Sequence, residues 1–400
     1  MRTSRAYYTV LALSALSIRM SGPYGVLWMQ RGLGVSALFI RQVAYAATQG
    51  VLDYPTGALA DKWGRGKVYA FGYALLGLSF FVLAAPLSPL TLVLSSVMTG
   101  AGLAFAGGAL EAWVTDQLKA DSQKNVGPSP RLETVLGRGD SISFAAMALA
   151  GLAGSGLNWV FGIRAPILAS GAFGLLTAVF VLAVLPENHG GLERPSYTRI
   201  LKDGLGTVLG SRFLISIGLA MLLFHTGYQM MGMLDAPLLS ERNVPDSVLG
   251  IVYAGADAFT SLGSLAASRL MPRWKPSAIA LGTSLIWGVG LVALVSVGHP
   301  ALAVVLFLGL DTLFGLRSPA LKAWRNSLIP SAVRATVLSV LSSVAFLGST
   351  FILAVITPVS DRIGLNGVML AAAGLAAVSG ISLAAARASE GSSHAHRLSL

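Results

Sequence analysis

The sequence predicts an all-α membrane protein with twelve transmembrane helices arranged as two pseudo-symmetric six-helix bundles. Three observations lead to this fold class: the composition, the number of apolar segments, and one long polar segment near the middle. Of the 400 residues, 54% are hydrophobic and only 11% are charged. Soluble domains contain about 25% charged residues, so a soluble enzyme is excluded. The apolar runs are long and do not alternate with polar residues, which excludes an outer-membrane barrel.

The apolar segments form two sets of six, each segment close to the length of about 20 residues that crosses a bilayer. The first set comprises residues 7–28, 38–60, 68–86, 90–118, 139–161 and 164–185. The second set comprises residues 212–234, 246–268, 276–297, 300–322, 333–358 and 364–386.

The polar segment between the two sets defines the expected domains. We expect an N-terminal six-helix bundle at residues 1–186 and a cytoplasmic linker at residues 187–211. A C-terminal six-helix bundle at residues 212–386 and a cytoplasmic tail at residues 387–400 complete the chain.

Two similarities between the halves suggest that the bundles are repeats. Leu110-Glu111-Ala112-Trp113 in the fourth span has a counterpart in Leu321-Lys322-Ala323-Trp324 of the tenth. Arg19 and His225 lie at similar depths in the first helix of each half. Repeats related by an axis normal to the membrane are typical of transporters.

Basic residues predict the orientation of the chain. The sequence has 28 Lys and Arg residues against 17 Asp and Glu residues, a net charge of +11. In the predicted topology, 21 of the basic residues lie at the N-terminus, in the even-numbered loops and in the tail. Because cytoplasmic loops are rich in Lys and Arg, we expect both termini in the cytoplasm and a multi-pass protein of the inner (plasma) membrane.

The positive charge is thus an orientation signal, and no nucleic-acid partner is expected.

The absence of Cys excludes disulfides and thiolate metal sites. The sequence also lacks the GxxxxGK[ST] and HExxH patterns of nucleotide-binding loops and zinc proteases. We therefore expect no cofactor, no metal and no enzymatic activity. The expected partners of this monomer are the lipid bilayer, protons and a small-molecule substrate.

A glycine-rich charged loop follows the second span. Gly57 and Gly64 permit close backbone approach and a tight turn. Asp61, at a helix end, can accept hydrogen bonds from the N-terminus of a neighbouring helix, for which the helix beginning near Arg334 is the candidate. Arg65 can pair with Asp116. The alternative is a solvated loop whose basic residues only set the topology.

This loop resembles the signature of the major facilitator superfamily, G-x-L-A-D-[RK]-x-G-R-[RK]-[RK]. The segment Gly57-Ala58-Leu59-Ala60-Asp61-Lys62-Trp63-Gly64-Arg65-Gly66-Lys67 departs from it only at Gly66, where a basic residue is usual. The resemblance implies a conformational role for Gly57, Asp61, Gly64, Arg65, Lys67, Asp116 and Arg334, which would lock the two halves in one state.

Other landmarks resemble drug-efflux members of that superfamily, such as Leu52-Asp53-Tyr54-Pro55-Thr56-Gly57 before the loop and Leu185-Pro186-Glu187 after the sixth span. The helix-5 signature of drug exporters contains a Gly-Pro pair. Gly151-Leu152-Ala153-Gly154-Ser155-Gly156 has no proline, which places drug antiport in doubt.

Several ionisable residues lie deep in the predicted spans, where a charge costs at least about 2.5–3.5 kcal/mol. They are the carboxylates Asp53, Glu111, Asp257 and Asp311, the arginines Arg19 and Arg317, and His225. An excess of carboxylates suits protons or a cationic substrate, since either restores neutrality.

The carboxylates and His225 are the candidates for proton coupling. Asp53 is the first choice, because the resemblance implies an acid just before Pro-Thr-Gly. The alternatives are a permanent pair of Asp53 with an arginine, structural pairs of Asp257 and Asp311 with Arg19 or Arg317, and a hydrogen-bonded helix position for His225.

The first helix of each half has a polar or broken middle, which predicts a central cavity. Pro23 frees a backbone carbonyl that is tolerable only against protein or water. The candidate cavity residues are Arg19, Tyr24, Tyr228, Gln229 and Met230. Arg19 is either a counter-ion of an acid or a group that binds an anionic substrate, and Met230 either lines the cavity or packs.

We therefore expect a secondary active transporter that exports a lipophilic or cationic small molecule in exchange for protons by alternating access. One alternative is proton-coupled uptake of a small metabolite, either a sugar or an organic anion. A second alternative is a membrane sensor that binds its ligand without transporting it.

Overall fold

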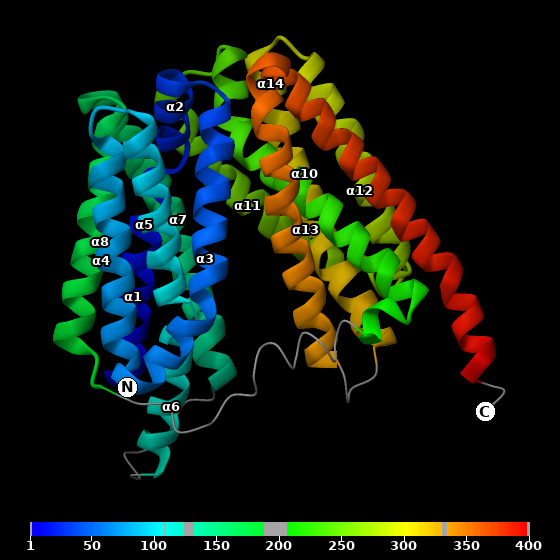
Figure 1. Ribbon diagram of the computed structural model, residues 1–400, viewed down its shortest axis with the longest axis horizontal. Coiled ribbons are helices and arrows are strands. Elements are labelled where there is room, and N and C mark those ends of the chain that lie inside the picture. Colours follow the sequence, from blue (N-terminus) through cyan, green and yellow to red (C-terminus); the bar gives the residue numbers. More distant parts are fainter. Residues whose placement is uncertain (1, 108, 124–131, 188–205, 330–333, 398–400) are drawn as a thin grey trace. The chain divides into compact units, whose positions relative to one another are not determined.

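Helices account for all regular structure in the computed structural model, which describes residues 2–107, 109–123, 132–187, 206–329 and 334–397. The contacts divide the chain into two units (Figure 1). The N-terminal unit comprises Met1–Glu193 and Pro245–Ala254, and the C-terminal unit comprises Arg194–Val244 and Gly255–Leu400. The predicted all-α membrane fold is confirmed, whereas the predicted linker at residues 187–211 lies largely outside the described residues.

The helices of the N-terminal unit are packed around α4 and α1. Helix α4 packs against α5 and α8, α1 against α7 and α8, and α3 against α5. These helices are α1 (Arg2–Arg19), α2 (Gly22–Leu33), α3 (Ser36–Trp63), α4 (Arg65–Ala84), α5 (Pro89–Ala106), α6 (Ala109–Gln123), α7 (Leu132–Phe161) and α8 (Arg164–Val184).

The break between α1 and α2 follows from Pro23, which stands in the first turn of α2 and cannot donate a backbone hydrogen bond. The neighbouring chain is satisfied by α8, since the Ser21 amide donates to Ser170 Oγ at 2.8 Å. Ser17 Oγ donates to the Ser170 carbonyl at 3.0 Å. The predicted break in the first helix is therefore present. The Ser170 side chain of α8 satisfies one backbone amide at the break, and Ser17 ties α1 to the backbone of α8.

The C-terminal unit contains longer helices. Helix α14 packs against both α10 and α12, and α12 packs against α13. These helices are α10 (Arg212–Glu241), α12 (Pro276–Ser296), α13 (Pro300–Leu328) and α14 (Arg334–Arg397), and α11 (Asp246–Leu270) begins in the N-terminal unit. The second predicted broken segment, around His225, lies within the continuous helix α10.

Ten segments of the described chain are long and apolar enough to cross a membrane, against twelve predicted spans. The second predicted span is helix α3, which is not among the ten and carries Arg41, Asp53, Asp61 and Lys62. The eleventh and twelfth predicted spans form one segment, Val340–Ser389, interrupted at Gly364, whose φ of 65° breaks the helical geometry. Helix α14 also continues to Arg397, past the predicted end of the last span at residue 386.

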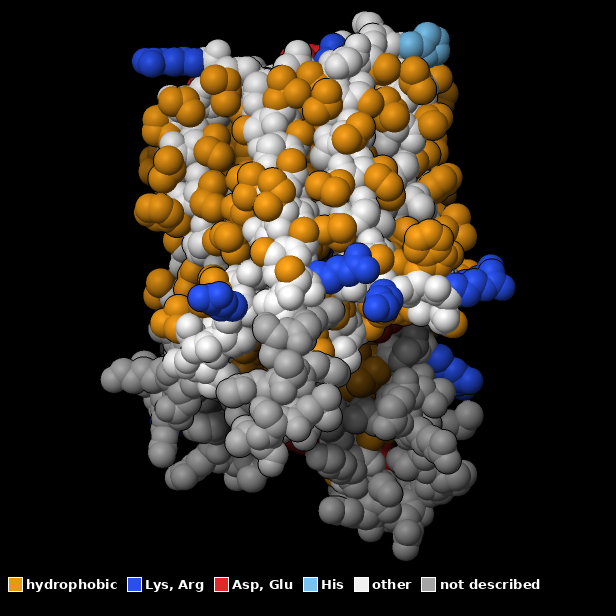
Figure 2. Space-filling view, turned by 90° about the vertical axis from the view of Figure 1, so that its right-hand side faces the viewer, with side chains coloured by type: hydrophobic (Ala, Val, Ile, Leu, Met, Phe, Trp, Pro, Cys, Tyr) orange, Lys and Arg blue, Asp and Glu red, His pale blue; other side chains and the backbone are white. Residues whose placement is uncertain are grey.

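Apolar and basic side chains are distributed over the surface as expected for a protein in lipid. Figure 2 shows a face on which hydrophobic side chains predominate, with Lys and Arg side chains near its upper and lower ends. Exposed apolar residues include Val289 at 69%, Phe351 at 72% and Ile381 at 66%. Because lipid chains are as apolar as these side chains, their exposure carries no penalty in a bilayer.

Helices α11 and α13 approach each other through glycines. A Cβ atom at Gly315 would overlap the Thr260 carbonyl oxygen, and one at Gly263 would overlap the Thr312 carbonyl oxygen. Close contact also allows Ser264 Oγ to donate to the Gly315 carbonyl at 3.0 Å. Small residues at such crossings permit the backbone packing and interhelical hydrogen bonds that hold membrane helices together.

Gly315→Ala should therefore lower the stability of the purified protein by about 1–3 kcal/mol, because the added methyl group forces the two helices apart. The control is Gly309→Ala in the same helix, where a Cβ would meet nothing within 4 Å. This control should be neutral or stabilising by up to about 1 kcal/mol. The measurement is the midpoint of thermal unfolding in detergent at one scan rate. Equal midpoints for the two variants would contradict the assigned contact.

Candidate functional site

The C-terminal unit contains a pocket of about 460 Å³ between α10, α13 and α14. Its walls follow helical periodicity, since the residues from each helix recur after three or four positions and share one face. They are Met221, Phe224, His225 and Tyr228 of α10, Phe314, Arg317, Ser318, Leu321, Lys322 and Arg325 of α13, and Ser342, Ala345 and Phe346 of α14.

Arg317 is the most buried charge in this pocket, with 6% of its surface exposed. Its Nε donates to Ser284 Oγ of α12 at 2.7 Å, and its guanidinium carbon lies 3.7 Å from the centre of the Phe224 ring. Its Nη2 is buried without a hydrogen-bond partner. Within the described part of the chain, Arg317 forms no ion pair with a carboxylate. Arg317 therefore has unused hydrogen-bonding capacity and an uncompensated charge.

The other charged residues of the pocket are also basic. Lys322 is exposed, and Arg325 donates from Nη1 to the thioether sulfur of Met221 at 3.3 Å. A thioether is a weak acceptor, and Arg325 Nε is buried without a partner among the described residues. The lining described here includes no Asp or Glu. The local potential is therefore positive and favours an anion.

The remaining wall is aromatic. The rings of Tyr228 and Phe314 are stacked, with their centres 3.9 Å apart and their planes 10° apart. Trp287 of α12 packs beside this stack. The centre of its ring lies 6.4 Å from that of Tyr228 and 4.9 Å from that of Phe224. Phe224 thus contacts both Trp287 and the Arg317 guanidinium, which fixes the position of the cation over its ring.

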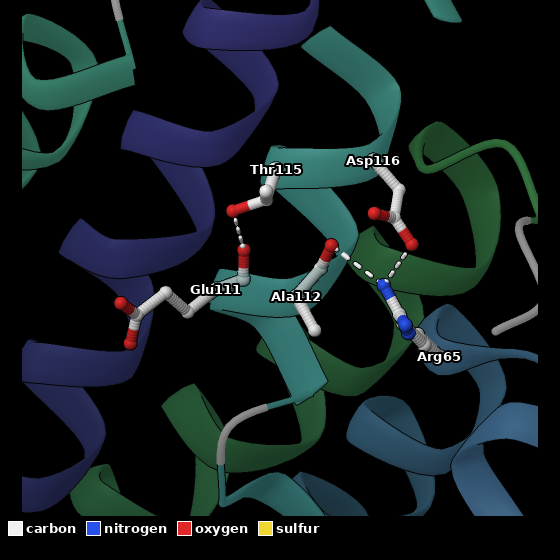
Figure 3. Close-up of a pocket in the computed structure, with 5 residues that line it drawn as sticks. All are labelled: Arg65, Glu111, Ala112, Thr115 and Asp116. Carbon is white, nitrogen blue, oxygen red and sulfur yellow. Dashed lines mark hydrogen bonds and ion pairs between the residues drawn. The ribbon is translucent and has the colours of Figure 1, made fainter. Parts of the chain in front are cut away.

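The N-terminal unit contains a second pocket of about 330 Å³, lined by Arg65 of α4 and by Glu111, Ala112, Thr115 and Asp116 of α6 (Figure 3). Arg65 is 8% exposed, forms an ion pair with Asp116 and donates to the Ala112 carbonyl at 2.7 Å. Figure 3 shows the Glu111 carboxylate pointing away from Arg65. The predicted contact between Arg65 and Asp116 is therefore present, and the charge of Arg65 in this pocket is compensated by a carboxylate.

The signature loop has the geometry that its glycines predict. Gly64 has a φ of 103° between the end of α3 and the start of α4, a conformation that disfavours side chains. Lys67 Nζ lies 3.6 Å from Glu187 Oε1, a largely exposed ion pair. The side chains of Asp61 and Arg334 and the surroundings of Gly57 lie outside the described part of the structure. Their conformational role remains a prediction.

The predicted proton-coupling residues differ in exposure. Asp53 and Glu111 are exposed, Asp257 is half-buried, and Asp311 is 7% exposed. His225 is half-buried, with its Nε2 at 3.2 Å from Gln229 Nε2. Of these five residues, only His225 lines the Arg317 pocket.

The predicted cavity residues are also distributed over different environments. Arg19 lies over the ring of Tyr253, 5.3 Å from its centre. Tyr24 is fully buried and its hydroxyl lies 3.0 Å from Ser155 Oγ and accepts from the Gly250 amide at 3.2 Å. Met230 is fully buried, whereas Tyr228 lines the pocket. A role in substrate binding remains a prediction for all five candidates: Arg19, Tyr24, Tyr228, Gln229 and Met230.

A sequence profile of the Major Facilitator Superfamily matches residues 7–353 of the chain. The chain belongs to this superfamily. Its sequence is 22% identical over 315 residues to that of the molybdate-anion transporter of Xenopus laevis. The aligned region covers 76% of this chain and 67% of that protein.

Solved structures show the same fold at low sequence identity. The crystal structure of the nucleoside transporter NupG has a TM-score of 0.78 at 16% identity, covering 96% of this transporter and 99% of NupG. The peptide-family transporter PepTSo has a TM-score of 0.72 at 12% identity, covering 97% and 98% of the two chains. These proteins are named for nucleosides, peptides and an oxoanion, so the superfamily alone leaves the substrate open.

Sequence reasoning missed three residues of this transporter. Arg325 lies beyond the predicted tenth span at residues 300–322, although its spacing of eight residues from Arg317 places both on one face of α13. Asp235 of α10 is 5% exposed, and its Oδ1 accepts from the Ala236 amide at 2.6 Å. Ser284 holds Arg317 from another helix, and no sequence pattern signals that contact.

The Arg65 contact can be tested by stability. Asp116→Ala should lower the stability by about 1–2 kcal/mol, since Arg65 loses its ionised partner while remaining buried and Asp116 is partly exposed. The control Glu187→Ala removes the exposed partner of Lys67 and should change stability by less than about 0.5 kcal/mol. Thermal unfolding in detergent compares the two variants, and an Asp116→Ala midpoint equal to that of the control would refute the assignment.

Proposed function

We propose that this transporter moves a small anionic molecule across the membrane by alternating access, with Arg317 as the group that binds its negative charge. The observation that carries the proposal is the buried Arg317 side chain, which has an unused Nη2 and lines a pocket whose described walls contain basic but no acidic residues. A buried charge without an ionised partner is costly, since removing one partner of a buried ion pair destabilises a protein by about 3–5 kcal/mol. An anionic ligand would supply the partner that Arg317 lacks.

The relative named as a molybdate-anion transporter supports an anionic substrate, and its identity of 22% leaves the ligand itself open. The proposal corresponds to the organic-anion alternative of the sequence analysis. An arginine is suited to such a substrate, because its planar guanidinium can donate two parallel hydrogen bonds to a carboxylate or an oxoanion.

Proton-coupled export of a lipophilic or cationic compound is the second candidate function. The exposed carboxylates Asp53 and Glu111 of the N-terminal unit favour it, since an accessible carboxylate can exchange a proton or meet a cation. In either candidate, Asp53 is the proposed site of proton coupling. A location in the inner membrane, both termini in the cytoplasm and a monomeric state belong to the same proposal.

Proteoliposomes with an interior pH dye distinguish the candidates. The panel contains an aromatic and an aliphatic carboxylate, molybdate, a sugar and tetraphenylphosphonium. We expect an anion to trigger proton movement, and Arg317→Gln to slow this movement about tenfold or more, because a hydrogen bond to a charged group contributes about 1.5–3 kcal/mol. Arg273→Gln, a change at an exposed arginine, should leave the rate unchanged.

Asp53→Asn provides the second readout. If Asp53 couples protons, this variant should abolish the dependence of the anion-driven rate on pH, whereas Arg317→Gln should lower the rate at every pH. Proton movement triggered only by tetraphenylphosphonium would reject the anion proposal in favour of export of a cation. Ligand binding without movement of ligand or protons would instead identify a sensor.

A further inference from the structure

We infer that the Arg317 pocket selects a planar aromatic carboxylate, with its carboxylate on the Arg317 guanidinium and its ring against the aromatic wall. The inference rests on the proposed function and specifies the class of anion. It depends on the size of the pocket, on the separation of its charged and apolar surfaces, and on the fixed position of Arg317.

The volume of the pocket favours an organic ligand. At about 460 Å³, it lies within the range of about 300–1,000 Å³ that is common for sites of small organic molecules. A lone inorganic oxoanion would occupy a small part of this space and would leave the apolar walls uncovered. A ligand with a ring system as well as an acidic group fills both parts of the pocket.

The apolar walls are suited to a flat ring. Phe346 of α14 lines the pocket together with Tyr228, Phe314 and Phe224 from two other helices. Tyr228 and Phe314 are already stacked at 3.9 Å, so a ligand ring meets the outer surface of this pair and does not insert between its members. Aromatic rings in such contacts gain free energy beyond that of their buried area, which favours an unsaturated ring over a saturated one.

Arg317 is held in place before a ligand binds. Ser284 accepts from its Nε and the Phe224 ring lies against its face, which leaves the buried Nη2 for a further acceptor. A fixed guanidinium loses little conformational freedom on binding, and two parallel hydrogen bonds to a carboxylate are the arrangement that its geometry favours. The oxygen of an uncharged ligand can also accept from Nη2, but it leaves the charge of the guanidinium uncompensated.

Lys322 and Arg325 extend the positive surface along α13. Arg325 lies eight residues after Arg317, which corresponds to about 12 Å along the helix axis. These residues raise the local concentration of anions near Arg317 and disfavour cations. They also distinguish the pocket from a purely hydrophobic one, which would accept uncharged aromatic compounds equally well.

Isothermal titration calorimetry on the purified full-length protein in detergent tests the inference with four probes: 2-naphthoate, its saturated analogue decahydro-2-naphthoate, uncharged 2-naphthalenemethanol, and molybdate. We expect 2-naphthoate to bind about threefold to tenfold more tightly than the saturated carboxylate. It should bind at least about tenfold more tightly than the alcohol. Molybdate should bind more weakly than 2-naphthoate.

Two variants separate the charge from the ring. Arg317→Gln should remove the preference for 2-naphthoate over the alcohol, whereas Phe346→Leu, at a half-buried position, should reduce the preference over the saturated carboxylate. Arg273→Gln is the matched arginine control and should bind like the unaltered protein. Thermal unfolding of each variant identifies any that fails to fold, and the probe series on the unaltered protein decides the inference independently.

The outcomes separate this inference from the proposed function. Equal binding of the two carboxylates, or a preference for molybdate, would overturn the aromatic selection while supporting an anion site. Equal binding of 2-naphthoate and the alcohol would overturn the role of Arg317, and with it the proposed anion transport. Binding of 2-naphthoate above all other probes, reduced by both variants in the expected way, would support the inference.

Discussion

The hydrogen bonding of the backbone in an apolar solvent is the constraint on which the rest of this structure depends. A backbone amide or carbonyl left unpaired in lipid costs several kcal/mol, so the described chain forms helices wherever it crosses the bilayer. Where the helix is interrupted, as between α1 and α2, the Ser170 hydroxyl of α8 accepts the hydrogen bond of the Ser21 amide. With the backbone satisfied, glycine contacts such as that of Gly315 with Thr260 determine how closely α11 and α13 pack.

A charge buried in this apolar environment needs compensation, and the buried arginines of the two units differ in the partners that provide it. Arg65 has both a carboxylate and a carbonyl as partners, so its charge is compensated within the protein. Arg317 has a hydroxyl and an aromatic ring, which hold it in position without cancelling its charge. A guanidinium in the first environment stabilises a structure, whereas one in the second environment retains affinity for an external anion.

Much of the fold could be predicted from the sequence, because the bilayer fixes the length of a span and the basic loops mark its ends. The contact of Arg65 with Asp116 was also accessible through the resemblance of the signature loop. The site was less predictable, because a count of deep charges gave an excess of carboxylates and suggested a cation. In the structure, neither Asp53 nor Asp311 lines the Arg317 pocket. Asp53 is exposed, and Asp311 lies six residues before Arg317, so the two side chains leave α13 in directions about 120° apart. The support from Ser284 depends on how α12 packs against α13, which a sequence of one chain does not encode in any local pattern.

The tetrapeptides Leu110-Glu111-Ala112-Trp113 and Leu321-Lys322-Ala323-Trp324 each contribute two residues to a pocket of their unit, and both end in a buried tryptophan. Their second residues carry opposite charges, Glu111 in one unit and Lys322 in the other. If the halves descend from one duplicated ancestor, the conserved tryptophan kept the scaffold while a change of charge at a neighbouring position gave each copy its own electrostatic character. Divergence of this kind requires few substitutions, and it gives two similar segments of one chain different electrostatic environments.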